Sequence, residues 1–152
     1  MPDQDVRLQL LQSWLEQCLP ALLEREGWGA VPPASLTPAS SDASFRRYFR
    51  WQAEGRSLIL MDAPPPQEDC RPFVRIAALL ADSGVHVPRV LAQDLERGFL
   101  VLDDLGRQTW LEVLTADNAD GLFESALQAL VSFQKLPAEG ALPVYDDALL
   151  RR

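Results

Sequence analysis

Two adjoining polar segments carry side chains suited to binding phosphate. The first is a run of small and hydroxylated residues: Ser40, Ser41, Asp42, Ala43 and Ser44. The second contributes three arginines: Arg46, Arg47 and Arg50. Serine hydroxyls can donate to phosphate oxygens, and a guanidinium can bind phosphate through two parallel N–H groups. These residue types permit phosphate contacts, and an ordinary polar hairpin and a solvated basic edge strand are the alternatives.

The other polar residues and the cysteines do not have the number or the spacing that a metal site, a disulfide framework or a nucleophilic pair requires. Asp103 and Asp104 are adjacent acids, but no third metal ligand lies near them in the sequence, so hinge and helix-cap roles are favoured. Cys18 and Cys70 with the single histidine, His86, are too few for a zinc site or a disulfide framework. We expect two reduced thiols, and a Cys70–His86 nucleophilic pair has no supporting motif.

Hydrophobic periodicity predicts the elements that must position these residues. An amphipathic helix from about residue 8 to 22, bent or ended near Pro20, comes first. Strands are expected at 35–39, 45–52, 57–62, 87–93 and 98–102, and helices at 69–84, 109–112 and 117–135. This order predicts an α+β fold with a five-stranded antiparallel sheet and one helix between the third and fourth strands.

Composition limits the class of partner. The chain has 152 residues, enough to bury a core, and its formal net charge is −8. This charge argues against a nucleic-acid or anionic-membrane surface, and of its 14 basic residues only Lys135 is a lysine. With no signal-peptide pattern and no run of about 18 apolar residues, we expect a cytoplasmic protein.

Several motifs resemble the aminoglycoside-phosphotransferase family. SGVHVPRVLA at 83–92 and GFLVLDDLG at 98–106 are similar to the family's G-V-x-V-P-x-V-L step and F-L-L-L-E-D-L-G hinge. SFRRYFR at 44–50, LMDAPP at 60–65 and EDCRPF at 68–73 look like the bacterial branch that phosphorylates N-acetylmuramate and N-acetylglucosamine at the anomeric hydroxyl.

The resemblance implies the N-lobe of a protein-kinase-like fold. It divides the chain into an N-terminal helix and loop (1–33), the N-lobe (34–103), and a hinge with the start of a helical C-lobe (104–152). The family's H-G-D-x-x-x-x-N catalytic loop does not occur in these 152 residues. We therefore expect no catalytic residue in this chain, with the catalytic base and the Mg²⁺ ligands in a missing C-lobe that is its natural packing partner.

By resemblance, ATP would bind between the strands and the hinge, residues 102–106. Leu102 takes the gatekeeper position, Asp103 offers its carbonyl oxygen to the purine, and Leu105 offers its N–H. The strand-three lysine of the wider family falls on Met61, and its helix acid on or near Phe73. Both halves of that ion pair are therefore absent, which avoids leaving one buried charge alone.

The resemblance also gives roles to the polar segments. Residues Ser40–Ser44 would approach the nucleotide phosphates, and Arg46 or Arg47 would supply the charge that the missing lysine does not. Apolar walls for the purine would come from Ile59, from Leu60 or Met61, and from Leu102.

The implied activity is that of an ATP-dependent sugar kinase acting on N-acetylmuramate or N-acetylglucosamine in cell-wall recycling, with this chain alone inactive. Two alternatives stay open. One is a kinase for another small acceptor, such as an aminoglycoside. The other is a non-catalytic nucleotide-binding or interaction remnant.

Overall fold

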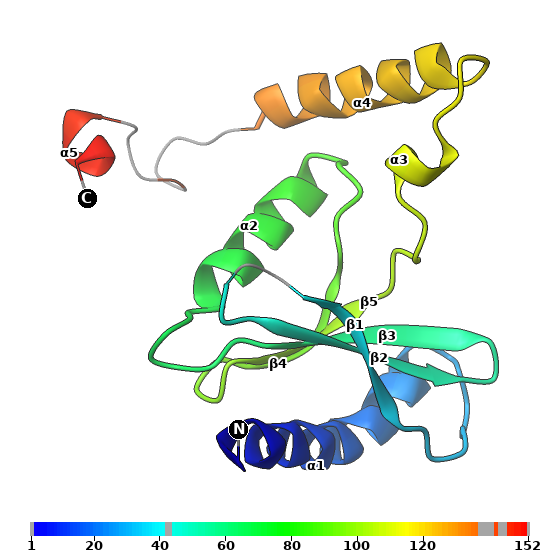
Figure 1. Ribbon diagram of the computed structural model, residues 1–152, viewed down its shortest axis with the longest axis vertical. Helices are drawn as coiled ribbons and strands as arrows, with labels where there is room; N and C mark the ends of the chain where they lie inside the picture. The colour runs from blue at the N-terminus through cyan, green and yellow to red at the C-terminus, as the bar shows by residue number, and fades with distance from the viewer. Residues whose placement is uncertain (1, 42–43, 137–141, 143–145, 152) are drawn as a thin grey trace. The chain divides into compact units, whose positions relative to one another are not determined.

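The protein is an α+β structure built on one antiparallel sheet, as seen in a computed structural model that describes residues 2–41, 44–136, 142 and 146–151 (Figure 1). The sheet has the strand order β1-β2-β3-β5-β4. The elements are α1 (Pro2–Arg25), β1 (Leu36–Ser41), β2 (Arg47–Ala53), β3 (Arg56–Asp62), α2 (Arg71–Asp82), β4 (Val90–Asp94), β5 (Phe99–Asp103), α3 (Trp110–Val113), α4 (Ala119–Gln134) and α5 (Asp147–Leu150). The predicted fold class is confirmed, and most boundaries lie within three residues of those expected.

Contacts group the chain into two units. The first comprises residues 1–78 and 87–107, and the second comprises 79–86 and 108–152. The first unit holds α1 and the whole sheet. The second unit holds α3, α4 and α5.

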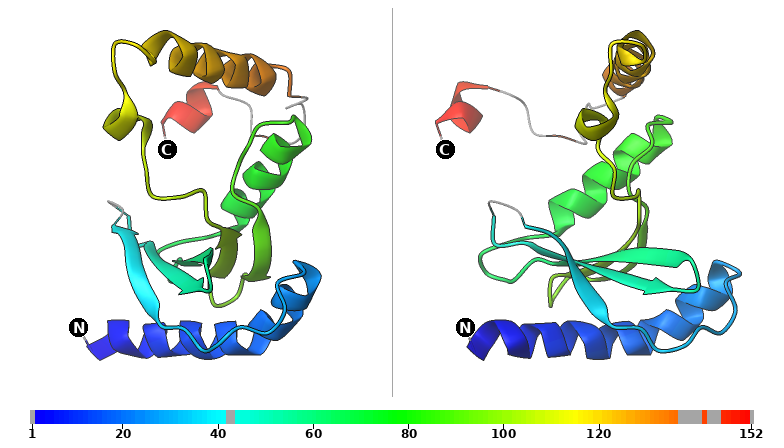
Figure 2. Two further views of the ribbon diagram at one scale, coloured as in Figure 1. Left: turned by 90° about the vertical axis from the view of Figure 1, so that its right-hand side faces the viewer. Right: turned by 45° about the vertical axis from the view of Figure 1, so that its right-hand side comes forward.

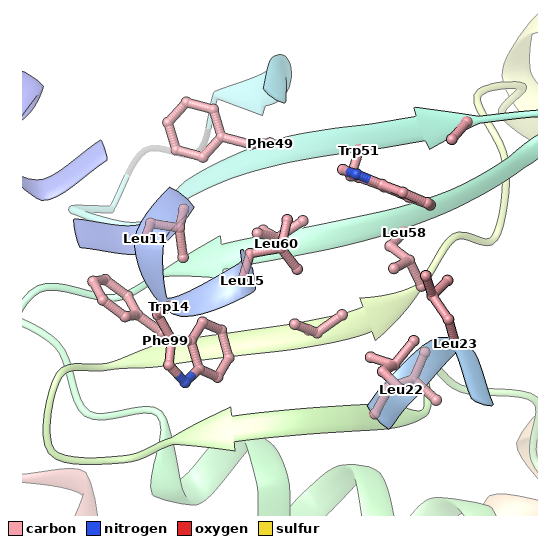
Figure 3. Packing of buried hydrophobic residues seen from close by; sticks show 13 residues of the cluster. Leu11, Trp14, Leu15, Leu22, Leu23, Phe49, Trp51, Leu58, Leu60 and Phe99 are labelled. Atoms are coloured by element: carbon pink, nitrogen blue, oxygen red, sulfur yellow. The ribbon is translucent and has the colours of Figure 1, made fainter. Parts of the chain in front are cut away.

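One face of the sheet packs against α1 (Figures 2 and 3). In a strand, alternate side chains point to opposite faces, and here Leu58 and Leu60 of β3 point toward the helix. Figure 3 shows Leu11 and Trp14 of α1 above these strands, and the Trp14 and Phe99 ring centroids are 5.7 Å apart. The buried members of this core are Leu11, Trp14, Leu15, Leu22, Leu23, Phe49, Trp51, Ala53, Leu58, Leu60, Leu91, Phe99 and Val101.

The helix α1 runs through Pro20 without ending there. It continues to Arg25, and its ribbon changes direction in the last third (Figure 1). Proline removes one helix hydrogen bond and crowds the preceding turn, which bends a helix. The bend keeps Leu22 and Leu23 on the sheet, so the helix continues because its last turns remain buried.

The opposite face of the sheet packs against the start of α2. Met61, Ala63, Cys70, Leu100 and Leu102 are buried there, with Phe73 and Val74 of α2 packed against them. This second core is smaller, and the same face continues into an open cleft toward the hinge.

A glycine permits a close approach between two loops near this core. Gly98 has φ of +74°, and a Cβ at this position would clash with the carbonyl oxygen of Ala63. The N–H of Ala63 donates to the carbonyl oxygen of Gly98 at 2.8 Å. The β4–β5 turn is therefore fastened to the end of β3 at a point where only glycine fits.

In the second unit, α3 and α4 present many apolar side chains. The N–H of Thr109 donates to the carboxylate of Glu112 at 2.7 Å, the capping contact that the sequence predicts. The large exposed side chains of α4 are Phe123, Leu127, Leu130, Val131 and Phe133. No helix in the described ranges is long and apolar enough to cross a membrane.

A buried carboxylate joins α1 to the sheet. Asp62 is fully buried and accepts from the Nε of Arg7 and from the Nε of Arg47, each at 3.0 Å. The Arg7 side chain also donates to the carbonyl oxygen of Arg97 at 2.9 Å. A charge-assisted group of this kind stabilises only while each buried charge keeps its partner.

We expect Asp62→Asn to lower the free energy of unfolding by about 3 kcal/mol, because an amide turns its NH₂ toward one of the two arginines and leaves buried positive charge uncompensated. Urea denaturation measures this. Asp82→Asn, at the exposed end of α2, is the matched control and should change stability by less than about 0.5 kcal/mol. Equal effects of the two substitutions would contradict the role given to Asp62.

Candidate functional site

A cleft of about 500 Å³ opens on the face of the sheet opposite α1. It is bounded by β1, β2, β3, the start of α2 and the hinge, all within the first unit. The lining residues are Pro38, Ala39, Ser40, Tyr48, Arg50, Ile59, Phe73, Pro88, Leu102, Asp103, Asp104, Leu105, Gly106 and Arg107.

Strand alternation decides which arginines can reach this cleft. Tyr48 and Arg50 line it, whereas Arg46 lies just before β2 and pairs with Glu68. Arg47 lies on the α1 side, where its guanidinium pairs with Asp62 and stacks 5.5 Å from the Phe49 ring centroid. Of the two alternatives named from the sequence, Arg46 or Arg47, the structure places Arg47 on the α1 side, where the buried carboxylate of Asp62 holds it.

The hinge is held to the sheet by an ion pair between Arg50 and Asp104. The Nε of Arg50 donates to Asp104 Oδ2 at 2.6 Å, and its Nη2 donates to Oδ1 at 3.0 Å. Arg50 also donates to the carbonyl oxygen of Gly106 at 3.1 Å, and the N–H of Gly106 donates back to Asp104 at 2.9 Å. The two side chains are only 9% and 5% exposed, so this bidentate contact fixes the hinge backbone in a nearly water-free setting.

This setting changes the acidity of Asp104. The Arg50 guanidinium is the main cause that lowers the pKa of the Asp104 carboxyl to about 2, against the opposing effect of burial. Hydrogen bonds from the N–H of Gly106 and the hydroxyl of Ser57 act in the same direction as Arg50. Asp104 is thus an ionised structural group and not a proton donor near neutral pH.

The neighbouring acid, Asp103, is also engaged by an arginine. Its carboxylate accepts from the backbone N–H of Arg89 at 2.7 Å and from the Arg89 Nε at 3.1 Å. Arg89 is held in turn by Glu26 at 3.1 Å. No group of three His, Cys, Asp or Glu residues that could hold a metal occurs among the residues the structure describes.

The hinge presents backbone polar groups beside apolar side chains. Leu102 is 3% exposed and lies with Ile59 in the wall of the cleft. Leu105 is 52% exposed, and its N–H has no hydrogen-bond partner within residues 44–136. This combination of an apolar wall and an available backbone donor is what a flat heteroaromatic ring needs.

The structure places the predicted phosphate-binding turn only in part. Ser40 lines the cleft, and Ser41 ends β1 opposite Arg47. Asp42 and Ala43 lie outside the described residues. Ser44 accepts a hydrogen bond from the N–H of Arg46 through its Oγ at 3.2 Å.

Apolar residues occupy the predicted lysine and acid positions. Met61 is fully buried, and Phe73 packs against the same cluster, so an apolar contact stands where the wider family has an ion pair. Of the predicted purine walls, Ile59 and Leu102 line the cleft and Met61 lies beneath them on the same face. Leu60 is wrong, because it points into the core against α1.

Sequence reasoning missed the Arg50–Asp104 pair as the support of the hinge. The sequence indicates that Arg50 and Tyr48 point to the same face of their strand. No local sequence signal, however, links position 50 with position 104. Tyr48, Phe73 and Pro88 were also missed as residues lining the cleft.

Two other features outside the cleft offer less chemistry. Burial raises the pKa of the Cys70 thiol, which makes it a poor nucleophile. A second cavity of about 580 Å³ lies between the last half of α1 and residues 29–33 and is lined mainly by apolar side chains.

Comparison with known proteins assigns the family. A sequence model described as the phosphotransferase enzyme family matches residues 35–152, and the chain belongs to this family. The chain is 69% identical over 148 residues to an N-acetylmuramate/N-acetylglucosamine kinase of Pseudomonas aeruginosa, covering 97% of this chain and 44% of that protein.

Two further relatives carry the same name. The enzyme of Pseudomonas putida is 64% identical over 152 residues, covering all of this chain and 45% of the relative. The enzyme of Neisseria meningitidis serogroup B is 37% identical over 147 residues, covering 93% of this chain and 40% of the relative. The chain spans less than half the length of these relatives, and the predicted family resemblance is confirmed.

The Arg50–Asp104 pair predicts an acid-dependent part of stability. Because the pKa of Asp104 is lower in the folded chain than the ordinary value near 4, its contribution of about 2 kcal/mol is present above about pH 4 and is lost as pH falls toward 2. We expect Asp104→Asn to destabilise the chain at pH 7 and to remove this part of the pH dependence.

Urea denaturation of both proteins between pH 7 and 2 measures the difference. Asp117→Asn, an exposed acid before α4, is the control. A stability gap between the original chain and Asp104→Asn that stays constant down to pH 2 would contradict the ionised pair.

Proposed function

We propose that this chain is the nucleotide-binding part of an ATP-dependent kinase that phosphorylates N-acetylmuramate or N-acetylglucosamine at the anomeric hydroxyl, in cell-wall recycling. The observation that carries the proposal is the cleft beside the hinge, where the N–H of Leu105, without a hydrogen-bond partner among the described residues, lies beside apolar walls. Membership of the phosphotransferase family and the names of the relatives support the reaction and the acceptor.

In this proposal the purine lies against Ile59 and Leu102. The carbonyl oxygen of Asp103 accepts from the base, and the N–H of Leu105 donates to it. Contact through the backbone lets the Asp103 and Asp104 side chains serve the hinge itself, as their arginine partners indicate. The phosphates then extend along the cleft toward Ser40 and the β1–β2 turn.

Transfer of the terminal phosphoryl group needs more than this cleft. Phosphoryl transfer relies on a residue that orients the acceptor hydroxyl and on metal ions that neutralise charge. These 152 residues contain no H-G-D-x-x-x-x-N motif, and the part of the chain that is described offers no metal site. The chain therefore binds and orients the nucleotide, and the acceptor and Mg²⁺ belong to residues beyond those described.

The backbone donor can be tested at one position with two substitutions. Leu105→Pro removes the N–H, whereas Leu105→Ala keeps it and removes only the side chain. We expect Leu105→Pro to weaken adenosine and ATP binding about tenfold, the size of one lost hydrogen bond, and Leu105→Ala to change either by less than about threefold. Isothermal titration calorimetry with each ligand measures this.

Thermal unfolding of both variants checks that the fold is retained. Equal loss of affinity in the two variants would move recognition from the backbone to the Leu105 side chain. Unchanged affinity in Leu105→Pro would remove the hinge from the proposed site.

The absence of the catalytic motif gives a second prediction for the chain as it stands. Incubated with ATP, Mg²⁺ and N-acetylmuramate, the purified 152-residue chain should form no sugar phosphate above the rate of a blank reaction, because it lacks a group to accept the proton of the sugar hydroxyl. Phosphorus NMR of the product mixture detects the transfer. Robust turnover would show that residues of this chain perform the chemistry.

A further inference from the structure

The phosphate end of the cleft lacks the cation that kinase-like folds place on the third strand. In protein kinases a lysine of this strand is paired with a helix glutamate. Here the cleft-facing residues of β3 are Ile59 and the buried Met61. The single lysine of the sequence, Lys135, follows α4 in the other unit.

Along β2, the alternate residues that point to the cleft side of the sheet form a row of polar side chains. Gln52 accepts from Arg107 at 2.7 Å, and Arg50 pairs with Asp104, so these two positions serve the hinge end. Tyr48 lines the middle of the cleft. Arg46 lies one residue before β2, and of the three arginines at 46, 47 and 50 it is the one farthest along the chain from Arg50 and Gln52.

The distance along this row fits a nucleoside triphosphate. Arg46 lies four positions before Arg50, which corresponds to about 13 Å of extended chain. A purine at the hinge would therefore have its outer phosphates beside Arg46. Tyr48, two positions from Arg46, lines the cleft.

Glu68 holds Arg46 in this position. One carboxylate oxygen accepts from the Nε of Arg46 at 3.0 Å, and the other accepts from the backbone N–H of Phe45 at 3.1 Å. The Glu68 side chain is 11% exposed, whereas that of Arg46 is 30% exposed. The acid is thus covered while its partner reaches solvent, and a guanidinium held through Nε still has an outer edge suited to a phosphate.

We propose that Arg46, oriented by Glu68, is the cation that binds the outer phosphates of the nucleotide, in place of a lysine from β3. The pair is a relocated equivalent of the strand–helix ion pair, with its arginine just before β2 and its acid just before α2. Glu68 is a positioning residue that acts through Arg46. This inference rests on the proposed function, because it takes the purine to lie at the hinge.

Binding of ATP and of adenosine by the 152-residue chain separates phosphate contacts from purine contacts. We expect Arg46→Ala to weaken ATP binding about 10- to 100-fold, the range of a charged hydrogen bond, and to leave adenosine binding within about twofold. Glu68→Ala should weaken ATP binding about three- to tenfold, again without an effect on adenosine. Arg75→Ala, which removes an exposed arginine of α2, controls for net charge and should leave both affinities unchanged.

The double variant identifies how Glu68 acts. If Glu68 works only by positioning Arg46, then Arg46→Ala with Glu68→Ala should bind ATP no more weakly than Arg46→Ala alone, because coupled residues do not add. Arg46→Lys should recover part of the ATP affinity. Circular dichroism and thermal unfolding accompany each variant.

Two results would overturn the proposal in distinguishable ways. If the original chain binds both ligands but Arg46→Ala weakens them equally, or weakens neither, Arg46 is not a phosphate ligand while the purine site stands. If the original chain binds neither adenosine nor ATP, the proposed function and this inference both fail.

Discussion

The ion pair between Arg50 and Asp104 is the interaction on which the functional face of the molecule depends. It joins the middle of β2 to the hinge across 54 residues of sequence, with both side chains almost fully covered. Because Arg50 also binds the carbonyl oxygen of Gly106, the hinge backbone cannot move away from β2 without breaking charged hydrogen bonds. The cleft beside Leu105 is therefore a preformed space with a fixed backbone edge. Preformed sites avoid the entropy cost of ordering a loop when ligand binds.

The two faces of the sheet carry different groups of residues: one face packs in the core with α1, and the other lines the cleft. Residues of one parity, such as Phe49 and Leu60, build the core with α1, and Asp62 gathers two arginines there. Residues of the other parity, Tyr48, Arg50 and Ile59, line the cleft. Neighbouring arginines have different partners, since Arg47 pairs with the buried Asp62 while Arg46 pairs with Glu68. A charge-changing substitution at one of them says nothing about the other.

Much of the fold could be predicted from the sequence because periodicity and turn residues act locally. The continuous apolar run of β3, the helix signals of α2 and the stop at Gly84 were among the local signals that predicted the strands and the inserted helix. The position of the hinge followed from the resemblance of residues 98–106 to one family. The sequence did not determine which face of the sheet each side chain of β2 points to. Its alternating aromatic and basic residues do not indicate which side packs against α1. That ambiguity left Arg46 and Arg47 as alternatives for the residue that faces the cleft.

Long-range polar partners could not be predicted for a different reason. The pairs Arg50–Asp104, Arg46–Glu68 and Arg47–Asp62 each join residues at least 15 positions apart. An arginine in a strand is compatible with many acids, and only the register of the sheet selects one. These three ion pairs therefore depend on the topology of the sheet. The Ser40–Ser44 run and the hinge, in contrast, can be recognised in short stretches of the sequence.

The most direct test of this account is a titration of the uniformly ¹⁵N-labelled chain with adenosine, followed by backbone amide NMR. The account predicts that shifts concentrate at Leu102, Leu105 and Ile59, and that the Leu105 amide proton moves downfield as it gains an acceptor. Shifts concentrated instead around the cavity between α1 and residues 29–33, with the hinge amides unmoved, would contradict it.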